Sequence, residues 1–241
     1  MSDAIPVILV ICLIALWVLV PMLGPRRARR RCRDAATGLL TGYRFVPAPD
    51  AHPLAELSSL PPFHYGKRQQ VLDAARGSFA GLPGEVFAYT CQENGSRHWY
   101  GVAVIRLGRD LPPIEVQHEK VFTSARVHYA PTEDLRPTGL KEFDSDHRTW
   151  TPDDRLAQEL ISPAFGRTLL AAEETFDWRV EAGLLIVWKR DGWRDSTSLV
   201  DSCLTVVHAL APVLDLDPDV FDVPRSISGP GTTDSAGSGT G

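Results

Sequence analysis

An uninterrupted apolar run near the start of the chain most constrains how this sequence can fold. Residues 5–23 read IPVILVICLIALWVLVPML, 19 residues without a charged side chain. In helical geometry this run is about 28 Å long, close to the hydrocarbon thickness of a bilayer. A buried core helix would usually carry a polar stripe, and this run has none. The sequence therefore predicts an N-terminal transmembrane helix.

Arginines follow the apolar run almost at once. Residues 26–33 read RRARRRCR, and the arginines among them are Arg26, Arg27, Arg29, Arg30, Arg31 and Arg33. Signal peptides and twin-arginine export signals place their positive charge before the apolar run, whereas only MSDA precedes it here. The positive-inside rule predicts that the N-terminus crosses the membrane and that the rest of the chain stays in the cytoplasm. The same arginines are predicted to contact anionic headgroups at the membrane interface.

The remainder of the chain is acidic. From Asp34 onward it has 19 basic and 29 acidic residues, and Asp3 alone among the 30 acids precedes Asp34. Such a body lacks the basic stripe that neutralises phosphates, so nucleic-acid binding is set aside. The four cysteines show no CxxC or Cys/His spacing of a zinc site, and neither a metal nor another cofactor is predicted.

The body is predicted to be an α+β domain, with an antiparallel sheet and helices packed on one face. Asn94-Gly95 between two apolar strands is a strong hairpin signal, and residues 181–183 join a second hairpin. Thr151-Pro152 predicts a helix start, with Thr151 as the capping residue. Strands are predicted at residues 43–46, 71–80, 85–91, 97–107, 114–118, 147–150, 176–180 and 184–188. Helices are predicted at residues 34–40 and 50–60, after Thr151 and Ser162, and from Ser196 to Pro212.

Three regions follow from these patterns. Residues 1–33 form the transmembrane anchor and its arginine segment, and residues 34–223 form the cytoplasmic α+β domain. Residues 224–241 read PRSISGPGTTDSAGSGTG, with Ile227 as the one large apolar side chain. Burial of one such residue does not offset the entropy of ordering, so this tail is predicted to be disordered.

Two clusters have side chains suited to chemistry. Cys91 and His98 flank the Asn94-Gly95 turn and could face each other as a thiol and its base, although no third group is evident. Asp144, Asp146 and His147 could hold a divalent ion, although Asp-Ser-Asp-His is not a recognised ligand spacing. A buried thiol beside a strand-edge histidine, and a polar loop, explain the two patterns without catalysis. No catalytic or metal-binding residue is therefore assigned.

The segment Trp188–Arg194 interleaves two tryptophans with three cations. Indole rings favour the headgroup level of a membrane, so Trp193 joins the arginines as a predicted membrane-interface residue. The alternative is a core Trp188 and a surface Trp193 beside cations whose aliphatic stems lie along the surface.

Several short motifs are dispersed over the body: Gly42-Tyr43-Arg44-Phe45-Val46, Pro61-Pro62-Phe63 before Gly66, Phe87-Ala88-Tyr89, Leu111-Pro112-Pro113 and Glu181-Ala182-Gly183-Leu184-Leu185. With the N-terminal span and its arginines, they resemble a family of uncharacterised single-span, membrane-anchored proteins of high-GC Gram-positive bacteria. The resemblance implies no known activity and supplies no catalytic residues.

Three hypotheses about function remain open. In the first, the chain is a membrane-tethered cytoplasmic binding or scaffold module that acts through a protein partner. In the second, it is a membrane-bound enzyme that uses Cys91/His98 or Asp144/Asp146/His147. In the third, the topology is inverted and the body faces the envelope. The first is preferred, because the sequence shows an anchor and an acidic body without a convincing catalytic constellation.

Overall fold

The computed structural model describes residues 26–30, 32–38, 40–47, 57–64, 66–79, 81–118, 134–172, 175–190 and 197–214. The predicted transmembrane run, the predicted disordered tail and most of the helix predicted at residues 50–60 lie outside these ranges. Within them, no helix combines the length and apolar character that a membrane crossing requires.

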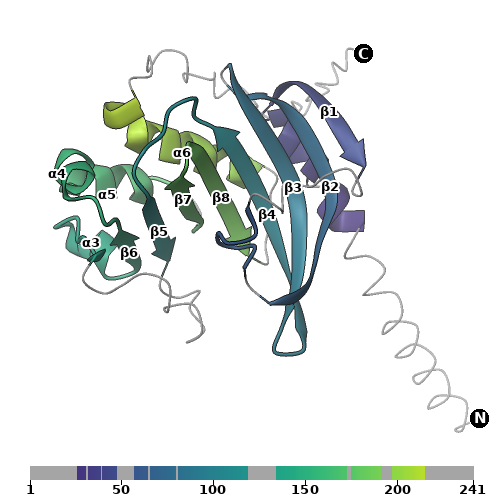
Figure 1. Ribbon diagram of the computed structural model, residues 1–241, viewed down its shortest axis with the longest axis horizontal. Coiled ribbons are helices and arrows are strands. Elements are labelled where there is room, and N and C mark those ends of the chain that lie inside the picture. The colour runs from purple at the N-terminus through teal and green to yellow at the C-terminus, as the bar shows by residue number, and fades with distance from the viewer. Residues whose placement is uncertain are drawn as a thin grey trace, which may run out of the picture.

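One antiparallel sheet organises the described part of the chain (Figure 1). Its strands are β1 (Thr41–Pro47), β2 (Lys67–Phe79), β3 (Leu82–Glu93), β4 (Ser96–Arg106), β5 (Ile114–His118), β6 (His147–Trp150), β7 (Asp177–Glu181) and β8 (Leu184–Arg190). They lie in the order β1-β2-β3-β4-β8-β7-β5-β6, and neighbours are antiparallel. The predicted α+β class with an antiparallel sheet is confirmed.

Within the described ranges, four helices pack on one face of this sheet. They are α3 (Lys141–Asp144), α4 (Asp154–Leu160), α5 (Pro163–Leu170) and α6 (Thr197–Leu214). A further helical segment, described at residues 26–30 and 32–38, precedes β1, and we call it the arginine helix. Buried side chains of the arginine helix, α5 and α6 meet Val86, Ala103 and Leu185 of the sheet in one hydrophobic cluster.

The opposite face of the sheet carries a second hydrophobic cluster. Residues 57–63 cover it, and the fully buried Phe63 lies 5.8 Å from Phe87 and 5.1 Å from Tyr89 between ring centroids. The hydroxyl of Tyr89 donates a hydrogen bond to the carbonyl oxygen of Phe63 at 3.3 Å. Sequence periodicity did not predict this second core, because it forms through contacts between residues 57–63 and β3, which are separate segments of the chain.

Two predicted boundaries need correction. The gap between the strands predicted at residues 71–80 and 85–91 is too long, because Phe79 already pairs with Leu82 and β3 begins at Leu82. Thr151 was predicted to cap the next helix, but the cap is Asp153, whose Oδ1 accepts a hydrogen bond from the amide of Leu156 at 2.6 Å. A carboxylate at this position satisfies a free amide and complements the helix dipole. Asp153 therefore takes the capping role that was predicted for the hydroxyl of Thr151.

Candidate functional site

The predicted membrane-interface arginines lie on a helix that is part of the packed body. Arg26, Arg27, Arg29, Arg30 and Arg33 are exposed, whereas Arg31 and Trp193 lie outside the described residues. On the other side of the same helix, the side chains of Cys32, Ala35 and Ala36 are 0% exposed. The arginine helix is therefore amphipathic, and it crosses the predicted boundary between anchor and body at residue 33.

Contacts along the arginine helix align it antiparallel to β1. Arg29 lies 3.8 Å from the carboxylate of Asp73 in β2, and Asp73 is the register partner of Pro47 at the end of β1. One turn later the guanidinium of Arg33 lies over the ring of Phe45, 5.2 Å from its centroid. One turn later again, the hydroxyls of Thr37 and Tyr43 lie 3.2 Å apart. The beginning of the helix and the end of β1 therefore meet at one corner of the molecule.

Cys32 fixes this helix to the sheet. Its thiol donates to the carbonyl oxygen of Val86 at 3.4 Å and approaches that of Asp73 at 3.7 Å. Burial, with a smaller contribution from the carboxylate of Asp73, raises the pKa of Cys32 to about 12. The thiol therefore stays protonated at neutral pH and acts as a small buried group with a weak donor.

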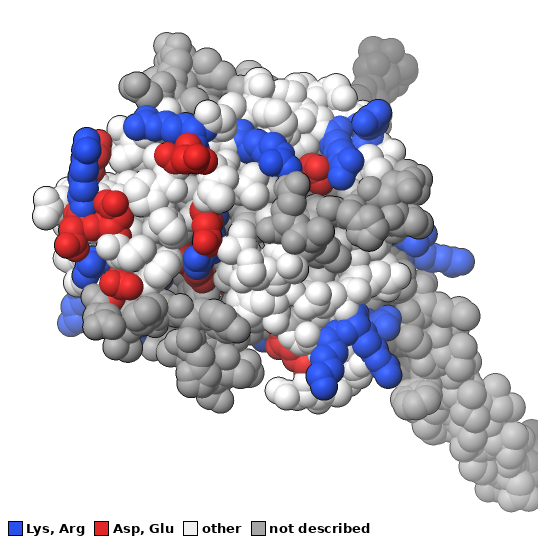
Figure 2. All heavy atoms as spheres, in the orientation of Figure 1, with Lys and Arg blue, Asp and Glu red and all other residues white. Residues whose placement is uncertain are grey.

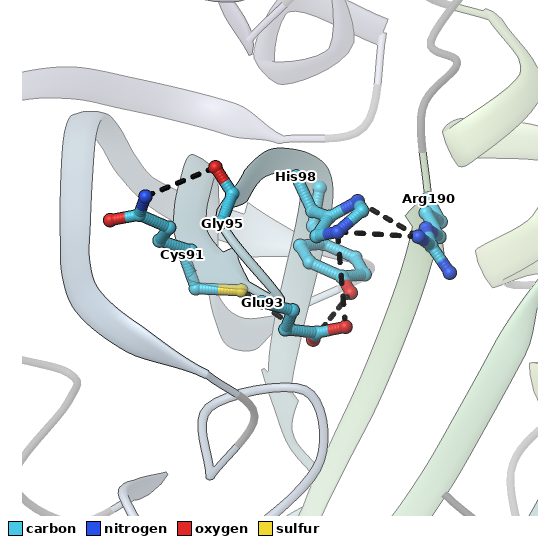
Figure 3. Close-up of polar contacts among 7 residues, drawn as sticks. Cys91, Glu93, Gly95, His98 and Arg190 are labelled. Atoms are coloured by element: carbon cyan, nitrogen blue, oxygen red, sulfur yellow. Dashed lines mark hydrogen bonds and ion pairs between the residues drawn. The ribbon is translucent and has the colours of Figure 1, made fainter. Parts of the chain in front are cut away.

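The structure brings Cys91 and His98 together as direct cross-strand partners in β3 and β4. Cys91 is 1% exposed, and its sulfur lies 3.8 Å from Oε1 of Glu93 (Figure 3). His98 Nδ1 lies 2.8 Å from Nη2 of Arg190, and its Nε2 lies 4.0 Å from Oε2 of Glu93. The hydroxyl of Tyr100 also donates to Glu93, at 3.5 Å. We call these five residues the Glu93 cluster.

The Glu93 cluster closes one end of the second hydrophobic core. Cys91 and Tyr100 belong to that core, while Glu93, His98 and Arg190 lie beyond it toward the β3–β4 turn. A nucleophilic cysteine needs an imidazole or a cation at its sulfur, but the sulfur here points toward a carboxylate (Figure 3). The arrangement links β3, β4 and β8 and does not favour covalent catalysis. Sequence reasoning missed Glu93 and Arg190, although the alternation of β3 places Glu93 on the same face as Cys91.

Asp144, Asp146 and His147 do not converge as metal ligands. The carboxylate of Asp144 accepts hydrogen bonds at 2.9 Å from the amide and hydroxyl of Thr138 and from the amide of Gly139. His147 instead stacks on the ring of Phe143, with centroids 4.4 Å apart. Within the described ranges, no group of three or more His, Cys, Asp or Glu side chains could hold a metal ion.

His147 pairs with His118 across β6 and β5, with ring centroids 5.0 Å apart. Burial lowers the pKa of His147, partly opposed by its hydrogen bond with the carbonyl of Phe143. A pocket of about 90 Å³ lies beside His147, lined mainly by the apolar side chains Val116, Leu169, Phe176 and Trp178. This volume suits a few water molecules or a small apolar group.

A buried ion pair that sequence reasoning missed lies on the sheet face opposite the helices. Glu115 in β5 and Arg179 in β7 are register partners and form a salt bridge, and Glu115 is 4% exposed. Arg179 also donates to Glu181 at 2.6 Å and lies over the ring of Trp150 at 5.0 Å. Burial raises the pKa of Glu115, while Arg179 opposes this by stabilising the carboxylate. The signal in the sequence was a charged residue at the alternate position of an apolar strand.

The fold is similar to that in the crystal structure of the mycobacterial trehalose monomycolate transport factor A, TtfA. The TM-score is 0.52 at 12% sequence identity, and the alignment covers 77% of this chain and 94% of that chain. At this identity the likeness shows a shared fold. The mycobacterial source of that structure agrees with the resemblance of this chain to proteins of high-GC Gram-positive bacteria. No family model and no curated protein sequence matches the chain.

Proposed function

We propose that this chain is a membrane-tethered cytoplasmic module that acts through a protein partner, as an accessory factor of a membrane transport process. The observation that carries the proposal is the packing of the arginine helix, whose Cys32, Ala35 and Ala36 are fully buried against the sheet. The folded body therefore begins three residues after the predicted span ends at Leu23. A body held this close to the membrane suits a protein that must present one surface to another membrane component.

We base the membrane tether on the sequence of the N-terminal region. The predicted span ends at Leu23, and only Gly24-Pro25 separate it from Arg26. The arginines after the span favour a cytoplasmic body and an N-terminus on the other side of the membrane. Arg26, Arg27 and Arg30 are exposed, so they remain available to the headgroup layer.

We base the expectation of a protein partner on the shared fold. The structure of similar fold is named a transport factor for trehalose monomycolate, and we carry a role in transport over to this chain. The contacts of the two catalytic candidates support the same choice, because Cys91 faces Glu93 and Asp144 binds the 138–139 loop. An accessory role needs an exposed surface and a fixed position, and it does not need an activated nucleophile.

Crosslinking in the native host tests the partner. The full chain, tagged after Gly241 and expressed at its native level, would be crosslinked in cells and purified from membranes for mass spectrometry. A matched control replaces residues 5–23 with an unrelated span of equal length. The proposal expects a membrane transport component to be enriched with both chains, because the body makes the contact. No enrichment over an untagged strain, or enrichment that disappears with the exchanged span, would contradict it.

Fusions after Gly241 test the predicted topology. A cytoplasmic body gives fluorescence from a fused fluorescent protein and no activity from fused alkaline phosphatase. The opposite result would place the body in the envelope, and partners would then have to be sought there.

A further inference from the structure

We infer that the body rests on the inner leaflet through a surface made by the arginine helix and the end of β1, so that this helix lies along the membrane plane. This inference rests on the tether of the proposed function and adds the orientation of the body and the lipid class that it contacts. We call Arg26, Arg29, Arg30, Arg33, Tyr43 and Phe45 the basic-aromatic surface.

The geometry of the helix gathers these side chains. At 100° per residue, Arg26, Arg29, Arg30 and Arg33 fall on one stripe, whereas Cys32, Ala35 and Ala36 fall on the stripe that faces the sheet. The four arginines are exposed. The nearby acid Asp73 already lies 3.8 Å from Arg29, and Asp34 is exposed further around the helix. The stripe therefore has a strong excess of positive charge, which matches a layer of anionic headgroups.

Phe45 adds an apolar side chain to this charged surface. It is 43% exposed, and Phe45 and Leu170 are the two exposed large hydrophobic residues in the described ranges. Tyr43 packs edge-on against Phe45 with centroids 5.5 Å apart, and Arg33 lies over the Phe45 ring at 5.2 Å. An aromatic side chain among arginines is typical of the membrane–water interface, where the ring enters the headgroup boundary and the cations meet lipid phosphates.

Chain length places this surface close to the bilayer. Three Cα–Cα steps separate Leu23 from Arg26, so the helix begins within about 11 Å of the end of the predicted span. From Arg26 to Arg33 the helix extends about 10 Å. A helix standing upright on the membrane would carry Phe45 away from the lipid, whereas a helix lying in the plane brings Arg26 and Phe45 into the headgroup layer together.

The charge distribution over the rest of the molecule agrees with this orientation. In Figure 2 most of the visible acidic side chains lie at the left, interspersed with basic ones, over the end that carries α3, α4 and α5 in Figure 1, while β1 lies at the opposite end of the sheet. An anionic leaflet attracts the arginine stripe more strongly than it attracts the α3–α5 end, where basic and acidic side chains are mixed. The body would therefore turn its β1 side to the lipid and present α3–α5 to the cytoplasm.

Site-specific photocrosslinking tests the orientation in the full chain. The photoreactive residue p-benzoylphenylalanine is placed at Phe45, which it resembles in shape, and in a second chain at Leu170, which is 40% exposed on α5. Each chain is reconstituted in nanodiscs of phosphatidylcholine with phosphatidylglycerol and irradiated, and lipid adducts are measured by mass spectrometry. We expect adducts from position 45 in several-fold excess over position 170. Equal yields, or no adduct at position 45 in an inserted chain, would overturn the inference.

A charge variant tests the lipid class. Arg26→Gln, Arg30→Gln and Arg33→Gln together should lower the adduct yield at position 45 several-fold, as should nanodiscs of phosphatidylcholine alone. The matched control is Lys141→Gln, Arg155→Gln and Arg167→Gln, three exposed cations of the α3–α5 end, which should leave the yield unchanged. An equal loss from both triple variants would overturn the role of the basic-aromatic surface.

The failure of this inference is distinguishable from failure of the proposed function. A chain that does not incorporate into nanodiscs removes the tether and, with it, both proposals. A chain that inserts without lipid contact at position 45 overturns the orientation and leaves the partner experiment unaffected.

Discussion

At the scale of single residues, Cys32 links the stability of the fold to pH. Its pKa is about 12 in the folded chain because the thiol is buried near Asp73, whereas an exposed thiol in the unfolded chain ionises near roughly 8.5. Between these values the unfolded state binds fewer protons, so the free energy of unfolding falls as pH rises. We expect Cys32→Ala to flatten this fall by up to about 1.4 kcal/mol per pH unit.

The measurement is urea unfolding of both chains at several pH values from neutral up to roughly pH 10, below most lysine and tyrosine ionisation. Ala36→Gly is the control, since Ala36 is equally buried on the same helix and does not titrate. It should lower the whole curve without changing its slope. An unchanged slope in Cys32→Ala would show that burial does not raise the pKa of this thiol.

Asp144 is a second residue whose role can be measured. Its carboxylate accepts three hydrogen bonds from Thr138 and Gly139 and so fixes the loop before α3. Asp144→Ala leaves these donors without their charged acceptor, and we expect a loss of about 2 kcal/mol in the free energy of unfolding. Glu142→Ala, an exposed change in the same helix, should cost less than about 0.5 kcal/mol. Equal losses would instead point to a general effect on α3.

At the scale of elements, hairpins were the most predictable part of the fold. Asn94 and Gly95 have φ values of 49° and 80° and join β3 to β4 with Glu93 paired to Ser96, as the Asn-Gly signal predicts. Local turn chemistry is sufficient there. The order β4-β8-β7-β5-β6 could not be predicted, because it depends on contacts between strands far apart in the chain.

The same distinction explains which parts of the candidate site could be predicted. The turn places Cys91 opposite His98, so this cross-strand pair could be predicted from the position of Asn94-Gly95 between them. Arg190 reaches His98 from β8, which is 92 residues away in the chain, and no local pattern carries that contact. The helix after Ser196 was also predicted, but Pro212 was expected to end or kink it. The helix continues to Leu214, and the carbonyl of Val213 accepts a hydrogen bond from Arg109 at 2.9 Å.

Gly66 follows the segment that covers the second core, and a substitution there tests how closely the chain packs against the β3–β4 hairpin. Gly66 has a φ of +67°, and a Cβ there would lie 2.6 Å from the carbonyl oxygen of Gln92. Gly108 has the same φ, with nothing within 4 Å of its Cβ position. Gly108→Ala should therefore cost only backbone strain, about 1 kcal/mol. Gly66→Ala adds a clash with backbone and should cost about 3 kcal/mol in unfolding free energy. Equal costs would show that residues 57–66 move away from the hairpin without penalty.

At the scale of the whole molecule, the position of the arginine helix decides where the folded body begins. The sequence divides the chain at residue 33, between a basic segment and an acidic domain. The helix crosses that point: Cys32 on one side and Ala35 and Ala36 on the other share one buried cluster with the sheet. The basic residues therefore belong to the body as well as to the predicted anchor, which explains why the charge pattern and the packing pattern give different limits.

This difference predicts the behaviour of two shortened chains. A chain beginning at Arg26 keeps the whole helix and should unfold cooperatively in urea. A chain beginning at Asp34 loses Cys32, and the five helical residues that remain are too few to persist alone. Ala35 and Ala36 then lose their burial, and the free energy of unfolding should fall by about 3 kcal/mol. If the two chains were equally stable, the helix would contribute nothing to the core. The body would then hang from the membrane by a flexible segment, and its orientation on the lipid would have no structural basis.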